Sequence, residues 1–240
     1  MNTTTAREHW NHWTVGELEK ERHGREPFRV EYEQRVVETV LALDIKPQPG
    51  RIPQLLDIGI GAGWITERLL SRFEYTGLDL SDVAIESARR RCPGVKLFAV
   101  DFLAWDPIVG KYDAVLCVDT VAYFADQEAA LHKMWNALRP GGTLIISTLN
   151  PFVFERQKWV NERKEKRMGD WLTANDLRAL LTGQGFEIES MRTVVPAGDQ
   201  GWLRVVNARR IKAILGRPYV AALEAMGLGQ HRVVVARKAA

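Results

Sequence analysis

Cysteine is scarce in this chain: only Cys92 and Cys117 occur among 240 residues. Two thiols cannot form a disulfide framework, and such sparing use of cysteine fits a reducing cytosol. Neither a C-x-x-C nor an H-x-x-x-H spacing occurs among the cysteines and the five histidines. These spacings are the usual sequence signals of a metal site, so the sequence predicts no metal ion. Cys117 lies inside an apolar run, where we expect a buried and inert thiol.

Long hydrophobic runs are also lacking. No apolar stretch approaches the ~18 residues of a membrane span, and the first residues show no apolar signal segment. The charge is nearly balanced, with 33 Lys and Arg against 30 Asp and Glu. A nucleic-acid enzyme usually needs a broad basic surface or an added binding module, and neither is visible. We therefore expect a cytoplasmic protein with neither a membrane nor a nucleic acid as its partner.

Glycine, in contrast, is concentrated where it matters most. Residues 55–64 read L-L-D-I-G-I-G-A-G-W, so an apolar run leads through Asp57 into three alternating glycines, and a helical pattern opens at Ile65. Glycine suits a backbone that must turn sharply and approach a ligand closely. The start of a helix offers unpaired N–H groups. The sequence predicts a loop that cradles a nucleotide-like ligand at the end of the first strand of an α/β sheet.

The glycine spacing discriminates between ligands. The dinucleotide fingerprint is G-x-G-x-x-G, whereas here Trp64 occupies the position of the third glycine. An indole there would hinder the close helix–strand packing that a dinucleotide loop needs. The pattern D-x-G-x-G-x-G over residues 57–63 instead resembles the first motif of class I S-adenosylmethionine-dependent methyltransferases. A Rossmann-type oxidoreductase remains the alternative, disfavoured by Trp64 and by the lack of a Tyr-x-x-x-Lys pattern.

Acidic residues end the next two predicted strands. Residues 74–80 are predicted to form a second strand that ends at Asp79 and Leu80, and Asp79 lies 22 residues beyond Asp57. This offset is close to the ~20 residues at which a βαβ unit places an acid on a ribose, and a carboxylate can accept from both ribose hydroxyls. The strand predicted at 95–100 leads into Asp101 and Phe102. In the family, the acid at this point accepts from the adenine amino group, and the following N–H meets the ring.

The downstream half of the chain is similar to the same family. Residues 112–118 form the continuous apolar run of a doubly buried strand, and residues 127–138 have helical periodicity. An L-R-P-G-G turn then leads into a strand at 143–147. The resemblance spans roughly residues 29–195. It implies an α/β fold that is Rossmann-like and doubly wound, with a mostly parallel seven-stranded sheet and an antiparallel last strand at 231–236.

Two regions outside this core are expected to set specificity within a single methyltransferase domain of residues 1–240. Residues 1–42 are predicted to form a helical lid, with Pro27 near a helix start. In related small-molecule enzymes such a helix closes over the cofactor, and an arginine from it pairs with the methionine carboxylate. Arg29 and Arg35 are the candidates, because guanidinium forks suit a carboxylate; an exposed helix arginine is the alternative for each.

The second region is a substrate-side insertion at residues 150–172. Its Trp159 and Trp171 either wall a substrate pocket or pack the segment against the core. The following helix is expected to begin after Thr173, which is a favourable N-cap residue.

The resemblance implies S-adenosyl-L-methionine as the cofactor. The residues expected to bind it are Asp57, Gly59, Gly61, Gly63, Asp79, Leu80, Asp101, Phe102, Val118 and Arg29. Among these, Asp57 is expected to fix the loop rather than to do chemistry. His23 and Tyr123 are weak candidates for a general base. Asp119 either faces the methyl-donor pocket or caps the next segment, and His132 falls in a predicted helix away from the strand ends.

The residues after the fourth predicted strand constrain the acceptor. Enzymes that methylate exocyclic amines of bases or glutamine amides resemble one another in an Asn/Asp-Pro-Pro-aromatic motif there. This chain has V-D-T-V-A-Y-F at 118–124 instead. We therefore predict methyl transfer to an O or N atom of a small-molecule acceptor, with RNA or protein methylation as the alternative.

Overall fold

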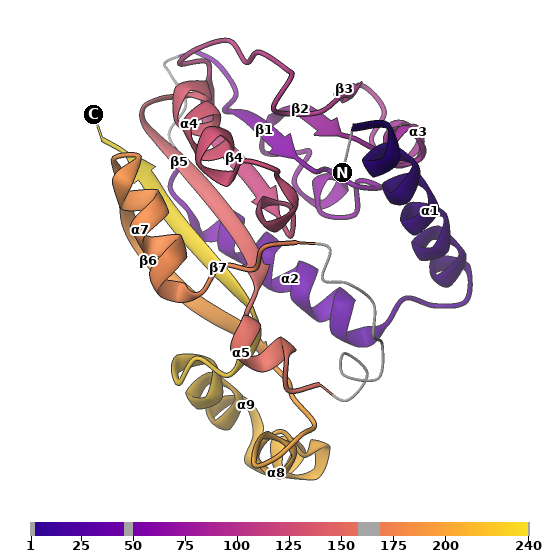
Figure 1. The fold of residues 1–240 in the computed structure, drawn as a ribbon, viewed down its shortest axis with the longest axis vertical. Coiled ribbons are helices and arrows are strands. Elements are labelled where there is room, and N and C mark those ends of the chain that lie inside the picture. The colour runs from indigo at the N-terminus through magenta and orange to yellow at the C-terminus, as the bar shows by residue number, and fades with distance from the viewer. Residues whose placement is uncertain (1–2, 46–49, 158–168, 240) are drawn as a thin grey trace.

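A seven-stranded sheet forms the centre of the computed structural model, which describes residues 3–45, 50–157 and 169–239 (Figure 1). The strand order is β3-β2-β1-β4-β5-β7-β6. The strands are β1 Gln54–Ile58, β2 Glu74–Asp79, β3 Lys96–Ala99, β4 Tyr112–Val118, β5 Leu138–Leu149, β6 Phe186–Pro196 and β7 Gly229–Lys238. β1, β2, β3, β4 and β7 lie where the sequence predicts strands, and β5 is longer than predicted.

Strand direction confirms the predicted fold class. β1 is parallel to both β2 and β4, and β4 is parallel to β5. β7 is antiparallel to its two neighbours, β5 and β6. The chain runs outward from β1 to β3 and then returns to the other side of β1 with β4. In an open α/β sheet, ligands bind at such a reversal, beyond the carboxyl ends of the strands.

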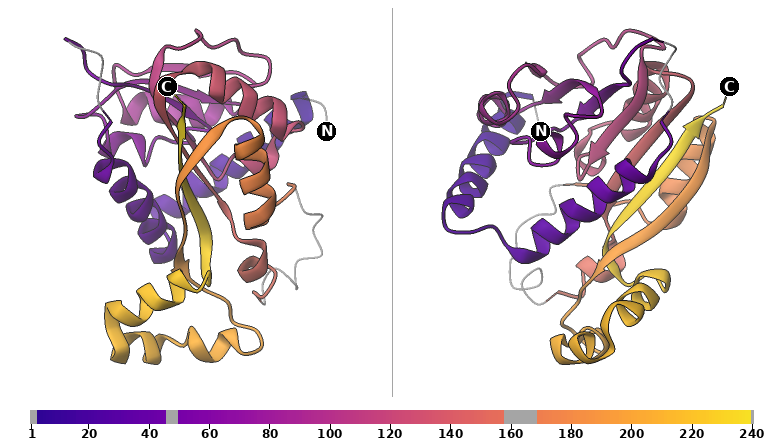
Figure 2. Two further views of the ribbon diagram at one scale, coloured as in Figure 1. Left: turned by 90° about the vertical axis from the view of Figure 1, so that its left-hand side faces the viewer. Right: turned by 180° about the vertical axis from the view of Figure 1, so that it is seen from behind.

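Helices cover both faces of the sheet (Figure 2). The main ones are α1 Thr3–Arg22, α2 Pro27–Ala42, α3 Asp82–Arg91, α4 Gln127–Ala137, α7 Ala174–Gly183 and α9 Arg209–Ala225. The short ones are α5 Pro151–Phe154, α8 Leu203–Val206 and the 3₁₀ turns η1 Thr66–Arg68 and η2 Val121–Tyr123. α4 and α7 lie in front of the sheet in Figure 1, and α2 lies behind it.

Alternation along the strands builds two hydrophobic cores. Leu56 of β1 packs in one core with side chains of α4 and α7, whereas its neighbour Leu55 packs in the other with side chains of α2. β4 divides in the same way, with Val115 on the first face and Leu116 on the second. Successive strand side chains point to opposite faces, so a strand buried on both faces needs an unbroken apolar run. Packing on both faces holds the sheet in place, and with it the residues at the ends of its strands.

Side-chain caps define where helices begin. At the start of α7, Thr173 accepts from the backbone N–H of Asp176 while the Asp176 carboxylate accepts from the backbone of Thr173, forming a capping box. The predicted N-cap role of Thr173 is confirmed. α2 has Pro27 in its first turn, where the missing proline N–H is not needed.

The helical pattern that opens at Ile65 was misleading. Only η1 forms there, held by i→i+3 hydrogen bonds such as that from the Leu69 N–H to the Thr66 carbonyl. The buried Thr66 hydroxyl donates to Asp57 Oδ2 at 2.8 Å. This hydrogen bond joins the segment to the end of β1, and the segment forms the tighter 3₁₀ turn in place of an α-helix.

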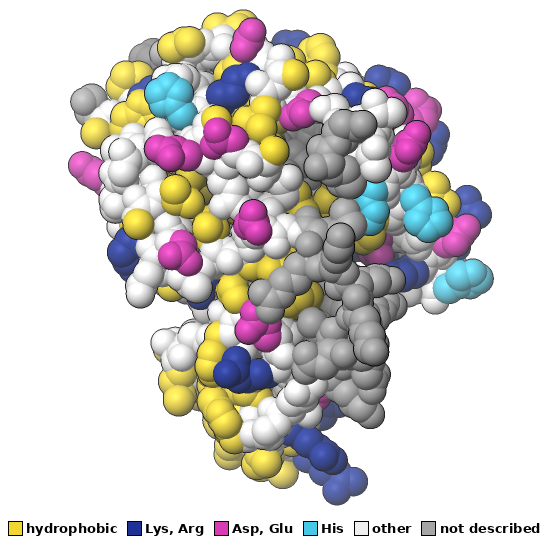
Figure 3. All heavy atoms as spheres, viewed as in Figure 1, with side chains coloured by type: hydrophobic (Ala, Val, Ile, Leu, Met, Phe, Trp, Pro, Cys, Tyr) yellow, Lys and Arg dark blue, Asp and Glu magenta, His cyan; other side chains and the backbone are white. Residues whose placement is uncertain are grey.

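The chain between β6 and β7 forms α8 and a kinked α9. Gly216 has a φ of +67° inside α9, with Pro218 two residues later, and both features interrupt an α-helix. α8 and α9 form the lobe at the bottom of Figures 1 and 3. Apolar side chains such as Trp202 and Ile214 are exposed on this lobe.

Two further expectations concern the insertion and membrane-spanning helices. Trp159 and the rest of residues 158–168, in the middle of the insertion predicted at 150–172, lie outside the described residues. No helix within the described part of the chain combines the length and apolarity that a membrane crossing requires.

Candidate active site

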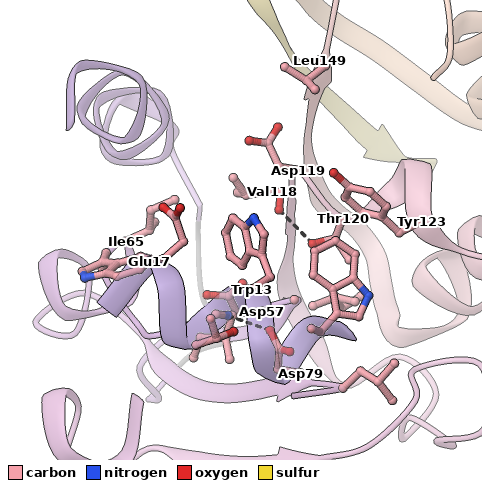
Figure 4. A pocket seen from close by; sticks show the side chains of 18 of the residues that line it. Trp13, Glu17, Asp57, Ile65, Asp79, Val118, Asp119, Thr120, Tyr123 and Leu149 are labelled. Carbon is pink, nitrogen blue, oxygen red and sulfur yellow. Dashed lines mark hydrogen bonds between the residues drawn. The ribbon is translucent and has the colours of Figure 1, made fainter. Parts of the chain in front are cut away.

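A cavity of about 1070 Å³ lies at the carboxyl ends of the parallel strands, under α1 and α2. Trp13 and Glu17 of α1 reach it from one side. Asp57, Asp79 and Asp119 reach it from the ends of β1, β2 and β4 (Figure 4). The reversal of strand order thus creates a space that is walled by helices and lined at its base by carboxylates.

The three glycines of the loop have different roles. Gly59 has a φ of +76°, and a Cβ there would lie 2.0 Å from the Thr120 hydroxyl, so no other residue fits. Gly61 also has a positive φ, but a Cβ there would enter open space on the cavity wall. A Cβ on Gly63 would press on Cys92 and Ala88 of the neighbouring segment. Gly59 and Gly61 therefore shape the cavity, whereas Gly63 permits the loop to pack on α3.

Asp57 supports this loop from below. Its carboxylate is 3% exposed and accepts from the Thr66 hydroxyl. Burial raises the pKa of Asp57 to about 7, because the charged form loses its hydration. The geometry agrees with the predicted role of Asp57 in fixing the loop.

Asp79 lies against the glycine loop. Its Oδ2 accepts from the Gly61 N–H at 2.9 Å and its Oδ1 from the Ser81 N–H at 2.8 Å. Burial raises the pKa of Asp79, while these backbone N–H groups act in the opposite direction. The carboxylate also lines the cavity beside Leu80, so its remaining lone pairs can accept hydrogen bonds from a ligand.

Asp101 and Phe102 extend the same wall. The Asp101 carboxylate accepts from the Leu103 N–H at 2.9 Å. The Phe102 ring is buried, with its centroid 5.7 Å from that of Phe124. Both residues line the cavity, as does Val118 at the end of β4. Three strand ends therefore bring the predicted cofactor residues to a single wall.

Of the two candidate arginines, only Arg29 reaches the cavity. Arg29 lines the cavity, where its guanidinium lies 5.7 Å from the Trp13 ring and its Nε 3.4 Å from a Glu33 carboxylate oxygen. Burial lowers the pKa of Arg29, but nearby acids, Asp119 foremost, outweigh it and leave the pKa above its usual value. Arg35 points elsewhere and pairs with Glu224 at 2.9 Å. Arg29 is the one that a ligand in the cavity would meet.

Of the two candidate bases, only Tyr123 lines the cavity. Tyr123 lines the cavity, and burial raises the pKa of its phenol well above the ordinary range. His23 is exposed just beyond α1 and is not part of the cavity lining. His132 is exposed on α4, within 3.2 Å of Gln184. The structure therefore brings only Tyr123 of these three into the cavity.

Asp119 does face the cavity, and it has a partner that the sequence did not reveal. His231 Nε2 lies 3.3 Å from Asp119 Oδ2, and the histidine is 3% exposed. The His231 ring stacks on Tyr32 of α2 at a centroid distance of 3.8 Å. His231 lies near the start of the antiparallel strand β7, so its position beside the end of β4 follows only from the sheet topology.

Helix α1 is tied over the cavity through Trp64. The Trp64 indole N–H donates to Glu21 of α1 at 3.0 Å, and Arg91 of α3 donates to the same carboxylate at 2.7 Å. The Arg25 guanidinium lies 4.2 Å from the Trp64 ring, within cation–π range. The residue that replaces the third glycine of a dinucleotide loop thus anchors the N-terminal helix.

Within 3–45, 50–157 and 169–239, no group of three or more His, Cys, Asp or Glu side chains could hold a metal ion.

Comparison with known proteins places this site in a family context. Residues 55–142 match a family model described as a methyltransferase domain. A ubiquinone biosynthesis O-methyltransferase of Alkalilimnicola ehrlichii is 33% identical over 104 residues, covering 40% of this chain and 42% of the relative. A trans-aconitate 2-methyltransferase of Acidovorax sp. is 33% identical over 122 residues, covering 50% and 45%. The chain spans about half the length of the curated relatives it matches.

Solved structures share the whole fold. A methyltransferase of Thermotoga maritima, described as a possible histamine N-methyltransferase, has a TM-score of 0.65 at 20% identity and covers 96% of this chain and 99% of its own. A magnesium protoporphyrin IX methyltransferase of Synechocystis with bound SAH has a TM-score of 0.65 at 17% identity, covering 99% and 100%. At such identities the likeness concerns the fold.

Proposed function

We propose that this protein is a class I S-adenosylmethionine-dependent methyltransferase that methylates a small molecule, since residues 55–142 match a methyltransferase-domain model and the chain shares its fold with solved methyltransferases. The observation that carries the proposal is the wall made by three consecutive strand ends. The glycine loop, Asp79 and Asp101 line one cavity of about 1070 Å³. This volume accommodates a nucleoside cofactor together with an acceptor.

The residues present fit S-adenosylmethionine. The open space at Gly61 admits the close approach of a ligand to the backbone. Asp79 would accept from ribose hydroxyls, and Asp101 would accept from the adenine amino group beside Phe102. Arg29 would pair with the methionine carboxylate from α2, since a guanidinium forms bidentate hydrogen bonds with a carboxylate. When bound, the cofactor supplies an electrophilic methyl group on a sulfonium.

The protein contributes position and exclusion of water. The strand ends fix one reactant, while α1 closes the other side through the contacts of Trp13, Glu21 and Trp64. Holding two reactants in attack geometry can lower a barrier by ~7–11 kcal/mol. We propose that residues 1–240 act together in this way, with α1 and α2 as the lid.

A small acceptor is favoured by the enclosure of the site. The lid helices, and aromatic side chains such as Trp10 and Tyr123, leave a cavity rather than a long open groove for a polymer. The Trp64 indole donates to Glu21 and contacts the Arg25 guanidinium. This position therefore does not provide the close helix–strand packing that a glycine gives in a dinucleotide-binding loop. Both cysteines are free and buried, which agrees with a cytoplasmic location.

Turnover tests the proposal. Purified protein is incubated with S-adenosylmethionine and a panel of phenols, carboxylic acids and amines, and formation of S-adenosylhomocysteine is measured. We expect acceptor-dependent product from the wild type and none from Gly61→Val, whose side chain would enter the cavity at a left-handed backbone position. Product formation by the folded Gly61→Val variant at the wild-type rate would show that the loop is not the cradle.

A further inference from the structure

The lobe formed by α8 and α9 exposes apolar side chains that its own packing does not use. Leu203 of α8 and Leu223 of α9 form the small core of the lobe together with Leu228. The large apolar side chains of the lobe that are more than half exposed are Trp202, Val205, Ile214, Leu215 and Met226. Single exposed apolar side chains are common, but a group of them on one small lobe marks a surface that another body covers.

The exposed charges of this lobe are of one sign. Residues 200–226 contain one acidic residue, Glu224, and five basic ones: Arg204, Arg209, Arg210, Lys212 and Arg217. The Glu224 carboxylate already accepts from Arg35 of α2 at 2.9 Å and from the Val195 N–H at 3.1 Å. The four arginines are exposed, and none of them has an ion pair within the part of the chain that the structure describes. The outer surface of the lobe is therefore positively charged and suits an anionic partner.

Apolar and basic side chains share the outer face of the lobe, where Figure 3 shows them side by side at the bottom of the molecule. Arg210 and Ile214 are four positions apart and are therefore neighbours on the surface of α9, and Ile214 is 81% exposed. The kink at Gly216 separates this first part of α9 from the second part. The Thr193 hydroxyl of β6 donates to the Glu224 carbonyl at 2.7 Å, so the second part is held on the sheet while the first part presents its outer face to solvent.

The lobe lies at the same end of the sheet as the cavity. It is inserted before β7, and β7 starts beside the end of β5, where His231 pairs with Leu149. Asn150 donates to the carbonyls of Gly227 and Gly229, each at 2.9 Å, which joins the base of the lobe to the end of β5. Leu149 and His231 both line the cavity, whereas α8 and α9 project past the end of the sheet as a tip (Figures 1 and 2).

We propose that this lobe docks the protein on the surface of an anionic lipid bilayer. Interfacial helices combine basic side chains with exposed apolar ones, so that the apolar groups enter the boundary of the acyl chains while the cations meet anionic headgroups. The long stems of the arginines can lie along the apolar groups while their charged ends stay in water. Docking of this kind turns the end of the sheet that holds the cavity towards the membrane. The inference goes beyond the proposed function and does not depend on it.

Other occupants fit this surface less well. A second copy of the chain in a two-fold dimer would place the same patch against itself and so bring the exposed arginines together. An acidic protein would pair with the arginines, but it would need a matching hollow for a projecting tip and apolar groups to cover Ile214 and Leu215. The lack of a long apolar run, from which we expected no membrane partner, does not bear on this mode of binding, because an interfacial helix lies on the bilayer without crossing it.

Vesicle flotation of the whole chain, without cofactor or acceptor, tests the proposal. The protein is mixed with vesicles of phosphatidylcholine alone, or with vesicles of equal parts of phosphatidylcholine and phosphatidylglycerol, at low and at physiological salt. We expect the protein to float with the anionic vesicles only. The floating fraction should fall at physiological salt, where screening limits the range of exposed charges to ~8 Å.

Two double variants separate the two components of the surface. Arg209→Gln combined with Arg210→Gln should lower the partition coefficient on anionic vesicles by about 25-fold, which is ~5-fold for each basic residue. Ile214→Ser combined with Leu215→Ser should lower it by at least ~10-fold, because apolar area is no longer removed from water. All four side chains are exposed, so the fold should be retained, and circular dichroism checks this.

The matched controls carry the same changes away from the lobe. Arg89→Gln combined with Arg90→Gln removes two exposed charges from α3. Ile108→Ser combined with Val109→Ser removes two exposed apolar side chains from the loop before β4. Both controls should bind vesicles as the wild type does.

Unchanged vesicle binding in both lobe variants would overturn the proposal, as would a wild type that binds neither vesicle or binds the two equally. A wild-type dimer in sedimentation that dissociates in Ile214→Ser with Leu215→Ser, without any vesicle binding, would assign the surface to a second copy and overturn the proposal as well. Because methyl transfer is not measured, none of these outcomes bears on the proposed function, which turnover tests separately.

Discussion

At the scale of single residues, the site combines buried carboxylates with different environments. Asp57 and Asp79 both lie on the cavity wall, where Asp57 is buried and Asp79 is half-buried. Asp79 accepts two backbone N–H groups, which compensate for lost water, whereas Asp57 has one hydroxyl donor. Asp57 therefore takes up a proton near neutral pH, and the loop above it becomes sensitive to pH.

Stability should report this proton. The pKa of Asp57 is about 7 in the fold against 3.8 as its ordinary value, so the folded protein binds a proton that the unfolded chain has lost. Stability is thus fully present below the ordinary pKa and falls as pH rises through about 7, by an amount on the order of 4 kcal/mol. We expect Asp57→Asn, which keeps an acceptor for Thr66, to remove most of this dependence.

Urea unfolding at pH 5 and pH 8 measures the effect. The quantity of interest is the difference between wild type and Asp57→Asn at each pH, because other groups titrate equally in both. Relative to the wild type, the free energy of unfolding of Asp57→Asn should be higher at pH 8 than at pH 5. A difference that does not change between the two pH values would show that Asp57 is ionised throughout.

At the scale of elements, the sequence predicted most of what hydrophobic pattern and turn chemistry determine. The strands from β1 to β4 and the N-cap Thr173 lie where they were expected. The helix at Ile65 was wrong because Thr66 bonds to Asp57, a contact that periodicity does not encode. Arg29 and Arg35 are six positions apart on one helix and so face different sides, but only the packing of α2 decides which faces the cavity.

The N-terminal helix α1 depends on a few polar contacts. Its Glu21 accepts from Trp64 and Arg91, and these contacts join the helix to the glycine loop and to α3. We expect Glu21→Ala to raise the rate of amide exchange in residues 3–22 by about 3- to 30-fold, since one or two such bonds contribute ~0.5–1.5 kcal/mol each.

Hydrogen-exchange mass spectrometry of the free protein makes this measurement. Glu86→Ala is the matched control, because Glu86 on α3 pairs only with exposed arginines among the described residues. Unchanged protection of α1 in Glu21→Ala would mean that other contacts, such as those of Asn11 and Arg7 with the start of α3, hold the helix in place.

At the scale of the whole molecule, the cavity belongs to no single segment. Its lining runs from α1 and Arg29 through the ends of β1, β2 and β4 to His231 on β7. The residues near the glycine loop could be found from sequence because their spacing follows the βαβ repeat. His231 could not, because an antiparallel last strand returns it to the site from 202 residues beyond Arg29 and no local pattern marks it.

Binding of the cofactor is the claim on which the account depends, and calorimetric titration tests it most directly. The protein is titrated with S-adenosylmethionine, with S-adenosylhomocysteine and with NAD. We predict binding of the first two and none of NAD. In Asp79→Ala, binding should weaken by about 1.5–3 kcal/mol through loss of hydrogen bonds to a charged group, while exposed Asp106→Ala should bind as the wild type. Binding of NAD alone, or of no ligand, would contradict the account.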